Sequence, residues 1–200
     1  MIIDRIMKGV DRKLRKEQAG FRPGRGTTEQ IFILRNILEQ ANEWRAPIYT
    51  HFVDFEKAFD SVHRESLWII MKSYGIPNKI IEAIRGIYQG FECAVIEENE
   101  TSEWFQIKTG VKQGCVMSGF LFLLAIDWIM RKTTADKRRG IRWDFTTSLE
   151  DLDFADDIVL LSSKFQDLNE KTSKMITEAA RLRLKLNAKK CRTLTTEYTR

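Results

Sequence analysis

The 200 residues of the chain are 43% hydrophobic, which excludes an intrinsically disordered chain and allows one domain with a sizeable core. The formal net charge of +5 indicates a mildly basic protein and suits a polyanionic partner such as nucleic acid, with an ordinary solvated surface as the alternative. Three widely spaced cysteines without a CxxC pair exclude a structural zinc site and a disulfide framework and indicate a reducing, intracellular setting. No apolar run reaches about 18 residues, so we expect no membrane span.

The first quarter of the chain predicts two helices and a strand. Residues 1–20 alternate apolar and basic side chains in a helix-like way, and the glycine-rich residues 20–26 predict a loop. A helix follows, because Thr27 and Gln30 form a capping-box pattern ahead of regularly spaced apolar residues. Residues 48–55 are rich in β-branched and aromatic side chains and predict a buried strand.

The rest of the chain alternates helices with pairs of strands. We predict helices over residues 64–74, 77–88, 117–131 and 168–183. We predict hairpins from residues 91–97 and 104–109 across a turn containing Asn99, from residues 149–154 and 158–162, and a final strand or hairpin in residues 184–187 and 192–196. This order predicts an α+β fold in which helices pack on one side of a mainly antiparallel sheet.

Two places carry acidic side chains among apolar neighbours. Asp54 stands near the end of the predicted strand 48–55, and Asp156 and Asp157 stand in the tight turn between two apolar strands. Burying a carboxylate is costly unless it is paired or bound to a metal, and adjacent carboxylates repel each other. A divalent cation would relieve that repulsion. The alternative is that Asp-Asp is ordinary turn chemistry and that Asp54 caps a following helix.

Three carboxylates from two strands are the ligand set that two-metal phosphoryl transfer requires. Two divalent ions about 4 Å apart clamp the attacking and leaving oxygens of an in-line displacement. Hard oxygen ligands favour Mg²⁺ over softer metals. The joint pattern therefore favours a nucleotidyl-transfer site over turn chemistry alone.

Five segments, in a fixed order, resemble motifs of reverse transcriptases from retrotransposons without long terminal repeats. Residues 52–60 (FVDFEKAFD) resemble motif A, residues 110–115 (GVKQGC) motif B, and residues 154–157 (FADD) motif C. Residues 18–27 (QAGFRPGRGT) resemble the upstream fingers motif, and residues 184–187 (LKLN) with Lys190 resemble motif D. The motifs span residues 18–190, nearly the whole chain, and their combination is very specific.

The resemblance implies a right-hand polymerase palm with partial fingers, built as an antiparallel sheet backed by helices. We expect a single domain over residues 1–200, with partial fingers in about residues 1–46 and the palm in about residues 47–200. A thumb and an endonuclease are expected to lie outside this segment. The implied partners are an RNA template, a DNA primer and deoxynucleoside triphosphates, and no membrane.

The resemblance also assigns metal ligands. Asp54, Asp156 and Asp157 would be catalytic and would bind two Mg²⁺ ions, for which Mn²⁺ would be an acceptable substitute. The main-chain carbonyl of Phe55 would be a further ligand.

Further residues would contact the nucleotide and the template. Phe59 falls where an aromatic gate excludes a ribose 2′-hydroxyl, and plain core packing is the alternative. Gln113 and Gly114 would approach the incoming nucleotide, and Lys190 would stabilise pyrophosphate. Among the remaining basic residues, Arg22 and Arg25 would contact template backbone or triphosphate, with two solvated arginines as the alternative.

The sequence departs from its relatives at two positions. Gly119 stands where many relatives have proline, and Arg183 stands where relatives usually have glycine. If the backbone at Arg183 needs a positive φ, the arginine costs about 1 kcal/mol or more. This substitution would fit a decaying element copy.

Two other functions compete with an RNA-directed DNA polymerase. One is an inactive, truncated retroelement remnant that at most binds nucleic acid. The other is a different right-hand polymerase, either an RNA-dependent RNA polymerase or an intron-encoded maturase. Phe59 argues against ribonucleotide synthesis, and the Glu-Lys-Ala-Phe-Asp run favours the retrotransposon branch.

Overall fold

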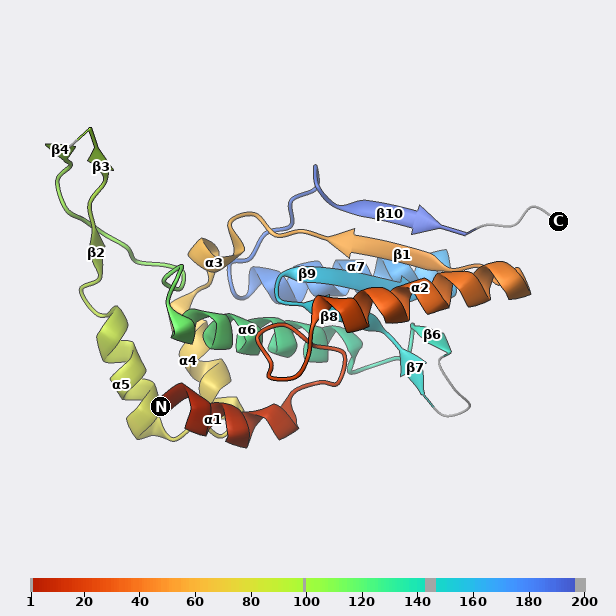
Figure 1. The fold of residues 1–200 in the computed structure, drawn as a ribbon, viewed down its shortest axis with the longest axis horizontal. Coiled ribbons are helices and arrows are strands. Elements are labelled where there is room, and N and C mark those ends of the chain that lie inside the picture. Colours follow the sequence, from red (N-terminus) through yellow and green to blue (C-terminus); the bar gives the residue numbers. More distant parts are fainter. Residues whose placement is uncertain (1, 99, 143–146, 197–200) are drawn as a thin grey trace.

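The computed structural model describes residues 2–98, 100–142 and 147–196. Its centre is a four-stranded antiparallel sheet in the order β10-β1-β9-β8, formed by Arg192–Thr195, Tyr49–Val53, Asp157–Ser162 and Asp151–Phe154 (Figure 1). The remaining strands form short antiparallel pairs: β2 (Glu92–Cys93) with β5 (Phe105–Gln106), β3 (Ile96–Glu97) with β4 (Glu100–Thr101), and β6 (Ile141–Arg142) with β7 (Ser148–Leu149). The helices are α1 (Ile2–Val10), the short 3₁₀ helix η1 (Asp11–Lys13), α2 (Thr27–Trp44), α3 (Ala58–Ser61), α4 (Arg64–Ser73), α5 (Asn78–Tyr88), α6 (Val116–Thr134) and α7 (Phe165–Ala180). The predicted α+β class is confirmed.

Both faces of the sheet are covered, but unequally. Along β9, Ile158 and Leu160 enter the main core together with α6 and α7, whereas Val159 and Leu161 point to the opposite face, where α2 packs. This alternation follows from the two-residue period of a strand. Figure 1 shows α2 crossing this face of the sheet, and residues of α2 line a groove together with Asp157, beside the Asp156 turn.

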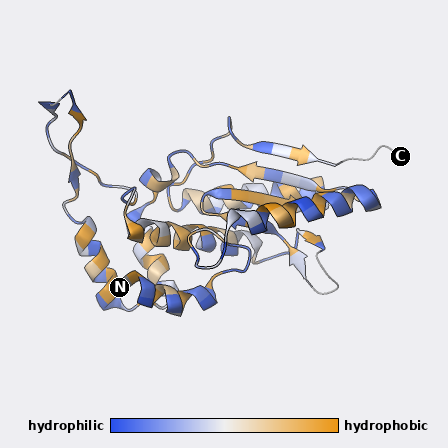
Figure 2. Ribbon diagram, viewed as in Figure 1, coloured by the Kyte–Doolittle hydropathy of each residue, from blue (hydrophilic) through white to orange (hydrophobic). Residues whose placement is uncertain are grey.

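Helix α6 is the centre of the main core. Residues 120–126 are all buried, as expected for a helix that is hydrophobic on every side. Figure 2 shows hydrophobic residues concentrated along α6 and β9. Asp127 is the exception, a fully buried carboxylate inside this helix. Within the described residues, no helix is long and apolar enough to cross a membrane.

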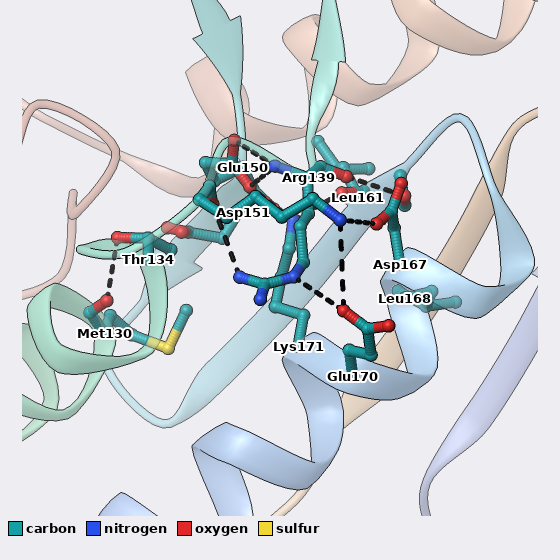
Figure 3. Close-up of polar contacts among 12 residues, drawn as sticks. Met130, Thr134, Arg139, Glu150, Asp151, Leu161, Asp167, Leu168, Glu170 and Lys171 are labelled. Carbon is teal, nitrogen blue, oxygen red and sulfur yellow. Dashed lines mark hydrogen bonds and ion pairs between the residues drawn. The ribbon is translucent and has the colours of Figure 1, made fainter.

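Lys171 of α7 ties that helix to the sheet (Figure 3). Its buried Nζ donates to the carbonyl oxygens of Glu150 at 2.9 Å and Leu161 at 2.7 Å, and lies 2.7 Å from Glu150 Oε2. Burial lowers the pKa of Lys171, and these contacts satisfy its three donors. The Glu150 carboxylate also accepts from the main-chain nitrogen of Arg139 at 2.9 Å. The network closes the β8–β9 hairpin at the end opposite to Asp156.

Local details differ from the sequence predictions. Gly26 is the N-cap of α2, and Gln30 Nε2 donates to the Glu17 carbonyl at 3.2 Å, so the predicted capping box is wrong. The first helix ends at Val10, before the predicted residue 20. The turn residue Asn99 lies outside the described residues.

The end of α7 has a left-handed residue at Arg183, with φ of 59°. The main-chain nitrogens of Arg183 and Leu184 donate to the carbonyls of Ala180 and Ala179, both at 3.0 Å. This is the Schellman arrangement, which usually places glycine at the left-handed position. The condition under which Arg183 would cost free energy, a positive φ, is therefore met.

Replacing Arg183 with glycine is expected to stabilise the chain. A left-handed non-glycine residue costs about 1–2 kcal/mol, and glycine loses about 0.5–1 kcal/mol through extra chain entropy, so we expect a net gain of up to about 1 kcal/mol. Urea denaturation measures this difference. The matched control is Arg181→Gly, where φ is −63° and glycine should destabilise. A loss of stability in Arg183→Gly would contradict the inference that the backbone is strained at Arg183.

Candidate active site

The three candidate aspartates meet at one end of the sheet. Ala155 and Asp156 form a two-residue turn, because Phe154 of β8 pairs directly with Asp157 of β9. Ala155 has φ of 59°, a conformation typical of tight hairpin turns. In the neighbouring strand β1, Val53 pairs with Ile158, so the following residue, Asp54, lies beside Asp157. The structure thus brings together the carboxylates that the sequence placed a hundred residues apart.

The electrostatics of this group indicate excess negative charge. Partial burial, followed by the neighbouring charges of Asp156 and Asp54, raises the pKa of Asp157 above its usual range. Among the described residues, Asp54 Oδ1 is a buried oxygen without a hydrogen-bond partner. The other oxygen, Oδ2, lies 3.7 Å from Lys190 Nζ. A cation at the unpaired oxygens would reduce the repulsion that these carboxylates share.

The segment that carries Lys190 is fixed to the Asp54 strand by main-chain contacts. The Asn187 nitrogen donates to the Asp54 carbonyl at 2.8 Å, and the Glu56 nitrogen donates to the Lys185 carbonyl at 2.8 Å. Asp54 N also contacts the Cys191 sulfur at 3.5 Å. The motif D and motif A segments therefore lie side by side. The predicted strand in residues 184–187 is reduced to one isolated bridge.

Phe59 lies in a stack of three aromatic rings. Its ring is stacked on the buried Phe122 of α6, with centroids 4.3 Å apart, and meets Phe21 edge-on at 6.2 Å. Phe21 in turn lies against Gly119, where an added Cβ would be 2.7 Å from the Phe21 ring. Phe59 is thus partly core, as the packing alternative held, and its position is fixed from two sides.

The loop with Gln113 and Gly114 is attached directly to the Phe59 segment. The nitrogens of Gly110 and Val111 donate to the carbonyls of Val62 at 2.8 Å and Phe59 at 2.7 Å. Gln113 is exposed, and its amide donates to Asp60 Oδ1 at 3.3 Å. Gly114 has φ of 80° and open space around its Cα, as a close-approach position requires.

Arg22 and Arg25 behave differently from each other. Arg22 is buried, and its guanidinium donates to Asp11 Oδ1 at 2.7 Å and to the carbonyls of Arg15 at 2.7 Å and Gln18 at 2.8 Å. Its donors hold the chain itself, which corrects our expectation of a template or triphosphate contact and also excludes the solvated alternative. Arg25 is half-buried, near the surface, where its guanidinium contacts the Lys16 carbonyl.

The fingers motif is docked on the aspartate turn without room for a side chain. Ala19 N donates to the Asp153 carbonyl at 2.8 Å, and Gln18 forms a parallel bridge with Asp153. A Cβ on Gly20 would lie 2.1 Å from Ala155 N. Glycine is therefore required at residue 20 for this segment to support the turn.

A buried ionic cluster, missed by the sequence analysis, lies beneath this contact. Arg15 donates to Asp151 Oδ1 at 2.6 Å and to Asp153 Oδ2, and its main-chain nitrogen donates to Asp127 Oδ1 at 2.8 Å. All three carboxylates are fully buried. Asp127 also accepts from Arg131 at 2.8 Å and from Tyr74. The available signal was three carboxylates interrupting apolar segments, since such groups need a buried cation.

The open face beside the aspartates is a shallow groove. It has a volume of about 280 Å³ and lies between α2, through Ile31 and Leu34, and the sheet, through Phe52 and Phe154. Asp157 is at its border. An extended ligand lying on this face would reach the carboxylates from the side that α2 leaves free.

The sequence model of the family described as "Reverse transcriptase (RNA-dependent DNA polymerase)" matches residues 1–199. The chain belongs to the reverse transcriptase family. It is 29% identical over 177 residues to the Pol polyprotein of the type-2 retrotransposable element R2DM of Drosophila melanogaster, covering 88% of this chain and 16% of that protein. It is 31% identical over 124 residues to the RNA-directed DNA polymerase of the mobile element jockey of Drosophila funebris, covering 61% of this chain and 13% of that protein. These relatives are proteins of retrotransposons without long terminal repeats, and the chain spans less than a fifth of either.

Solved structures agree with the reverse transcriptase fold. A telomerase from Candida tropicalis, lacking its C-terminal domain, superposes with a TM-score of 0.74 at 17% identity, covering 98% of this chain and 40% of that one. The same enzyme with a fragment of telomeric RNA gives a TM-score of 0.69 at 16% identity, with 96% and 33% covered. The fold predicted from the motif order is therefore confirmed.

Reverse transcriptases generally use a divalent metal ion, and the donors present fit one in part. The unpaired, buried oxygen of Asp54 and the mutual repulsion at Asp157 suit a hard cation. As they stand, however, no three His, Cys, Asp or Glu side chains in residues 2–98, 100–142 and 147–196 form a group that could hold a metal.

The buried cluster predicts a pH-dependent stability difference for Asp153→Asn. Burial, and then the charge of Asp151, raises the pKa of Asp153 well above its usual 3.8. Its proton stabilises the folded chain at low pH, and that contribution is lost as the pH rises through the raised pKa. We therefore expect the free energy of unfolding of Asp153→Asn, relative to the parent chain, to increase as the pH rises above about 5, over the pH range below the raised pKa of Asp153.

Urea titrations across this range provide the measurement. The control is Asp167→Asn, because Lys137 lowers the pKa of Asp167 and its difference from the parent should stay constant above about pH 5. A constant difference for Asp153→Asn would show that the carboxyl is ionised throughout.

Proposed function

We propose that this chain is the catalytic part of an RNA-directed DNA polymerase, which transfers deoxynucleotides to a primer 3′-hydroxyl by two-metal chemistry. The observation that carries the proposal is the pairing of β1 with β9, which sets Asp54 beside Asp157 at the turn that holds Asp156. Carboxylates from two strands at one edge match the ligand set of two-metal nucleotidyl transfer. Family membership supports the same reaction.

The aspartates and Phe55 would hold the metal ions. When bound, two Mg²⁺ or Mn²⁺ ions would lower the pKa of the primer hydroxyl and neutralise the triphosphate. Asp54 would bind through its unpaired oxygen Oδ1, while Oδ2 lies 3.7 Å from Lys190 Nζ. Lys190 would donate to the leaving pyrophosphate.

The neighbouring residues would select and orient the nucleotide. Phe59, fixed by Phe122 and Phe21, presents an apolar surface that offers no partner to a 2′-hydroxyl. Gln113 and Gly114 would contact the incoming nucleotide, since their loop is bonded to the Phe59 segment. Among the two fingers arginines, only Arg25 remains as a candidate template contact.

The domain division follows from these roles. We propose partial fingers in about residues 1–46 and a palm in about residues 47–200, with an RNA template and a DNA primer lying along the open face of the sheet. The groove beside α2 supports this path, because it borders Asp157.

Removing a metal ligand is expected to abolish primer extension. In a chimera in which this chain replaces the matching segment of a full-length relative, Asp156→Asn or Asp54→Ala should lower Mg²⁺-dependent extension on RNA by about a thousandfold or more. The control is Asp167→Asn, which removes a half-buried carboxylate of α7 that pairs with Lys137. Normal extension by either active-site variant would refute the ligand assignment.

A primer-extension assay of the isolated chain distinguishes an active module from an inactive remnant. Extension of a primer on RNA by the 200 residues themselves would establish activity. If both the chain and the chimera fail to extend primers while still binding RNA, the alternative of an inactive element that at most binds nucleic acid is correct.

Sugar selection tests Phe59 separately. Phe59→Ala in the active chimera is expected to raise incorporation of ribonucleotides relative to deoxynucleotides by about tenfold or more, because the apolar barrier to the 2′-hydroxyl is removed. Single-nucleotide kinetics with both sugars give the ratio. Phe165→Ala, an aromatic residue of α7, is the control. An unchanged ratio would leave Phe59 with a packing role alone.

A further inference from the structure

Arg64, the first residue of α4, bonds to the segment that leads into Gln113. Its Nε donates to the Gly110 carbonyl at 2.8 Å, while its terminal nitrogens donate to Ile107 at 2.8 Å and Thr109 at 3.0 Å. A longer contact of 3.5 Å reaches the Tyr88 carbonyl, and the guanidinium carbon lies 4.9 Å from the centre of the Tyr88 ring. One side chain therefore holds the end of α5 and the entrance of the loop together.

The position of Arg64 is unfavourable for the helix that carries it. A cation in the first helical turn opposes the helix dipole. Partial burial lowers the pKa of Arg64. Its hydrogen-bond acceptors in the described part of the chain are main-chain carbonyls, so they supply no full negative charge. The hydrogen bonds to residues 107–110 offset these costs.

The loop is held from its other side by α3. Gly110 and Val111 bond to the carbonyls of Val62 and Phe59, and Thr109 Oγ1 donates to the Asp60 carbonyl at 3.0 Å. A Cβ on Gly110 would lie 2.5 Å from the Asp60 oxygen, so the loop has little freedom to shift toward α3. Arg64 closes the opposite side, and residues 107–110 are fixed between the two.

We propose that Arg64 is a positioning residue that sets the loop carrying Gln113 and Gly114 for the incoming nucleotide. The inference rests on the proposed function for its kinetic consequence, but the ordering of the loop does not depend on activity. Arg64 itself would not touch the substrate. It would act by fixing the backbone from which Gln113 and Gly114 project.

Lysine cannot replace arginine in this role. The guanidinium is a planar fork that reaches several carbonyls in one geometry, whereas an ammonium is a compact point donor. Arg64→Lys therefore preserves the charge and removes the fork. Arg85 provides the matched control, because it lies in the same surface pocket but pairs with Glu65 at 3.0 Å, and Arg85→Lys leaves the loop contacts intact.

Hydrogen exchange on the 200-residue chain tests the ordering directly. The amides of Gly110, Val111 and Cys115 are hydrogen-bonded. In Arg64→Lys their exchange should accelerate by about tenfold or more, while the amides of β9 and the melting temperature stay close to those of Arg85→Lys. Unchanged exchange in the loop, or a uniform increase over the whole chain, would overturn the inference.

Nucleotide kinetics in the active chimera test the consequence. Arg64→Lys should raise the KM for deoxynucleotides by about tenfold and change kcat much less, with primer-template affinity preserved. This increase should shrink in a Gln113→Ala background, because the residue through which Arg64 acts is then missing. An equal increase in KM in both backgrounds would contradict the inference that Arg64 acts through Gln113. Accelerated loop exchange without any polymerase activity would instead retain the positioning role and reject the proposed function.

Discussion

The architecture depends on Arg15, a buried cation among three buried carboxylates. It joins the segment after η1 to β8, through Asp151 and Asp153, and to α6, through Asp127. Removing one partner from such a cluster leaves an uncompensated charge, which typically costs about 3–5 kcal/mol. The cluster therefore fixes the position of the fingers motif along the β8–β9 hairpin. Gly20 then contacts the aspartate turn so closely that no side chain fits between them. The ion pairs of Arg15 and the main-chain contact of Gly20 together hold the aspartate turn in place.

The site is assembled mainly by main-chain hydrogen bonds between segments that are distant in sequence. The strand pairing of β1 and β9 brings Asp54 to the turn, the bond from Asn187 brings the Lys190 segment, and the bonds of Gly110 and Val111 bring the Gln113 loop. Backbone contacts of this kind tolerate many side-chain changes. This explains how a chain with only 17% identity to a telomerase retains the same fold with a TM-score of 0.74.

The sequence patterns correctly predicted the features that local chemistry determines. They were wrong where contacts between distant segments determine the partner of a side chain. The apolar run before Asp54 and the tight turn at Asp156 could be predicted, because they follow from strand period and turn geometry. The resemblance, and not local chemistry, pointed to Arg183 as a position where glycine is usual. The predicted capping box was wrong because Gly26, and not Thr27, is the N-cap of α2, while the Gln30 amide donates to the Glu17 carbonyl. The predicted role of Arg22 was wrong because its guanidinium points inward and donates to main-chain carbonyls, which a glycine-rich loop sequence does not reveal. The metal-ligand roles themselves stay predictions.

The aromatic stack couples the evolution of residues that are distant in the sequence. Phe59 is held by Phe122 below and by Phe21 beside it, and Phe21 fits only because residue 119 has no side chain. If Phe59 selects the sugar as proposed, that selection depends on the size of residue 119 as well. A larger residue at position 119 would displace Phe21, and Phe59 would lose one of its two supports. Positions 21 and 119 are therefore expected to change as a pair.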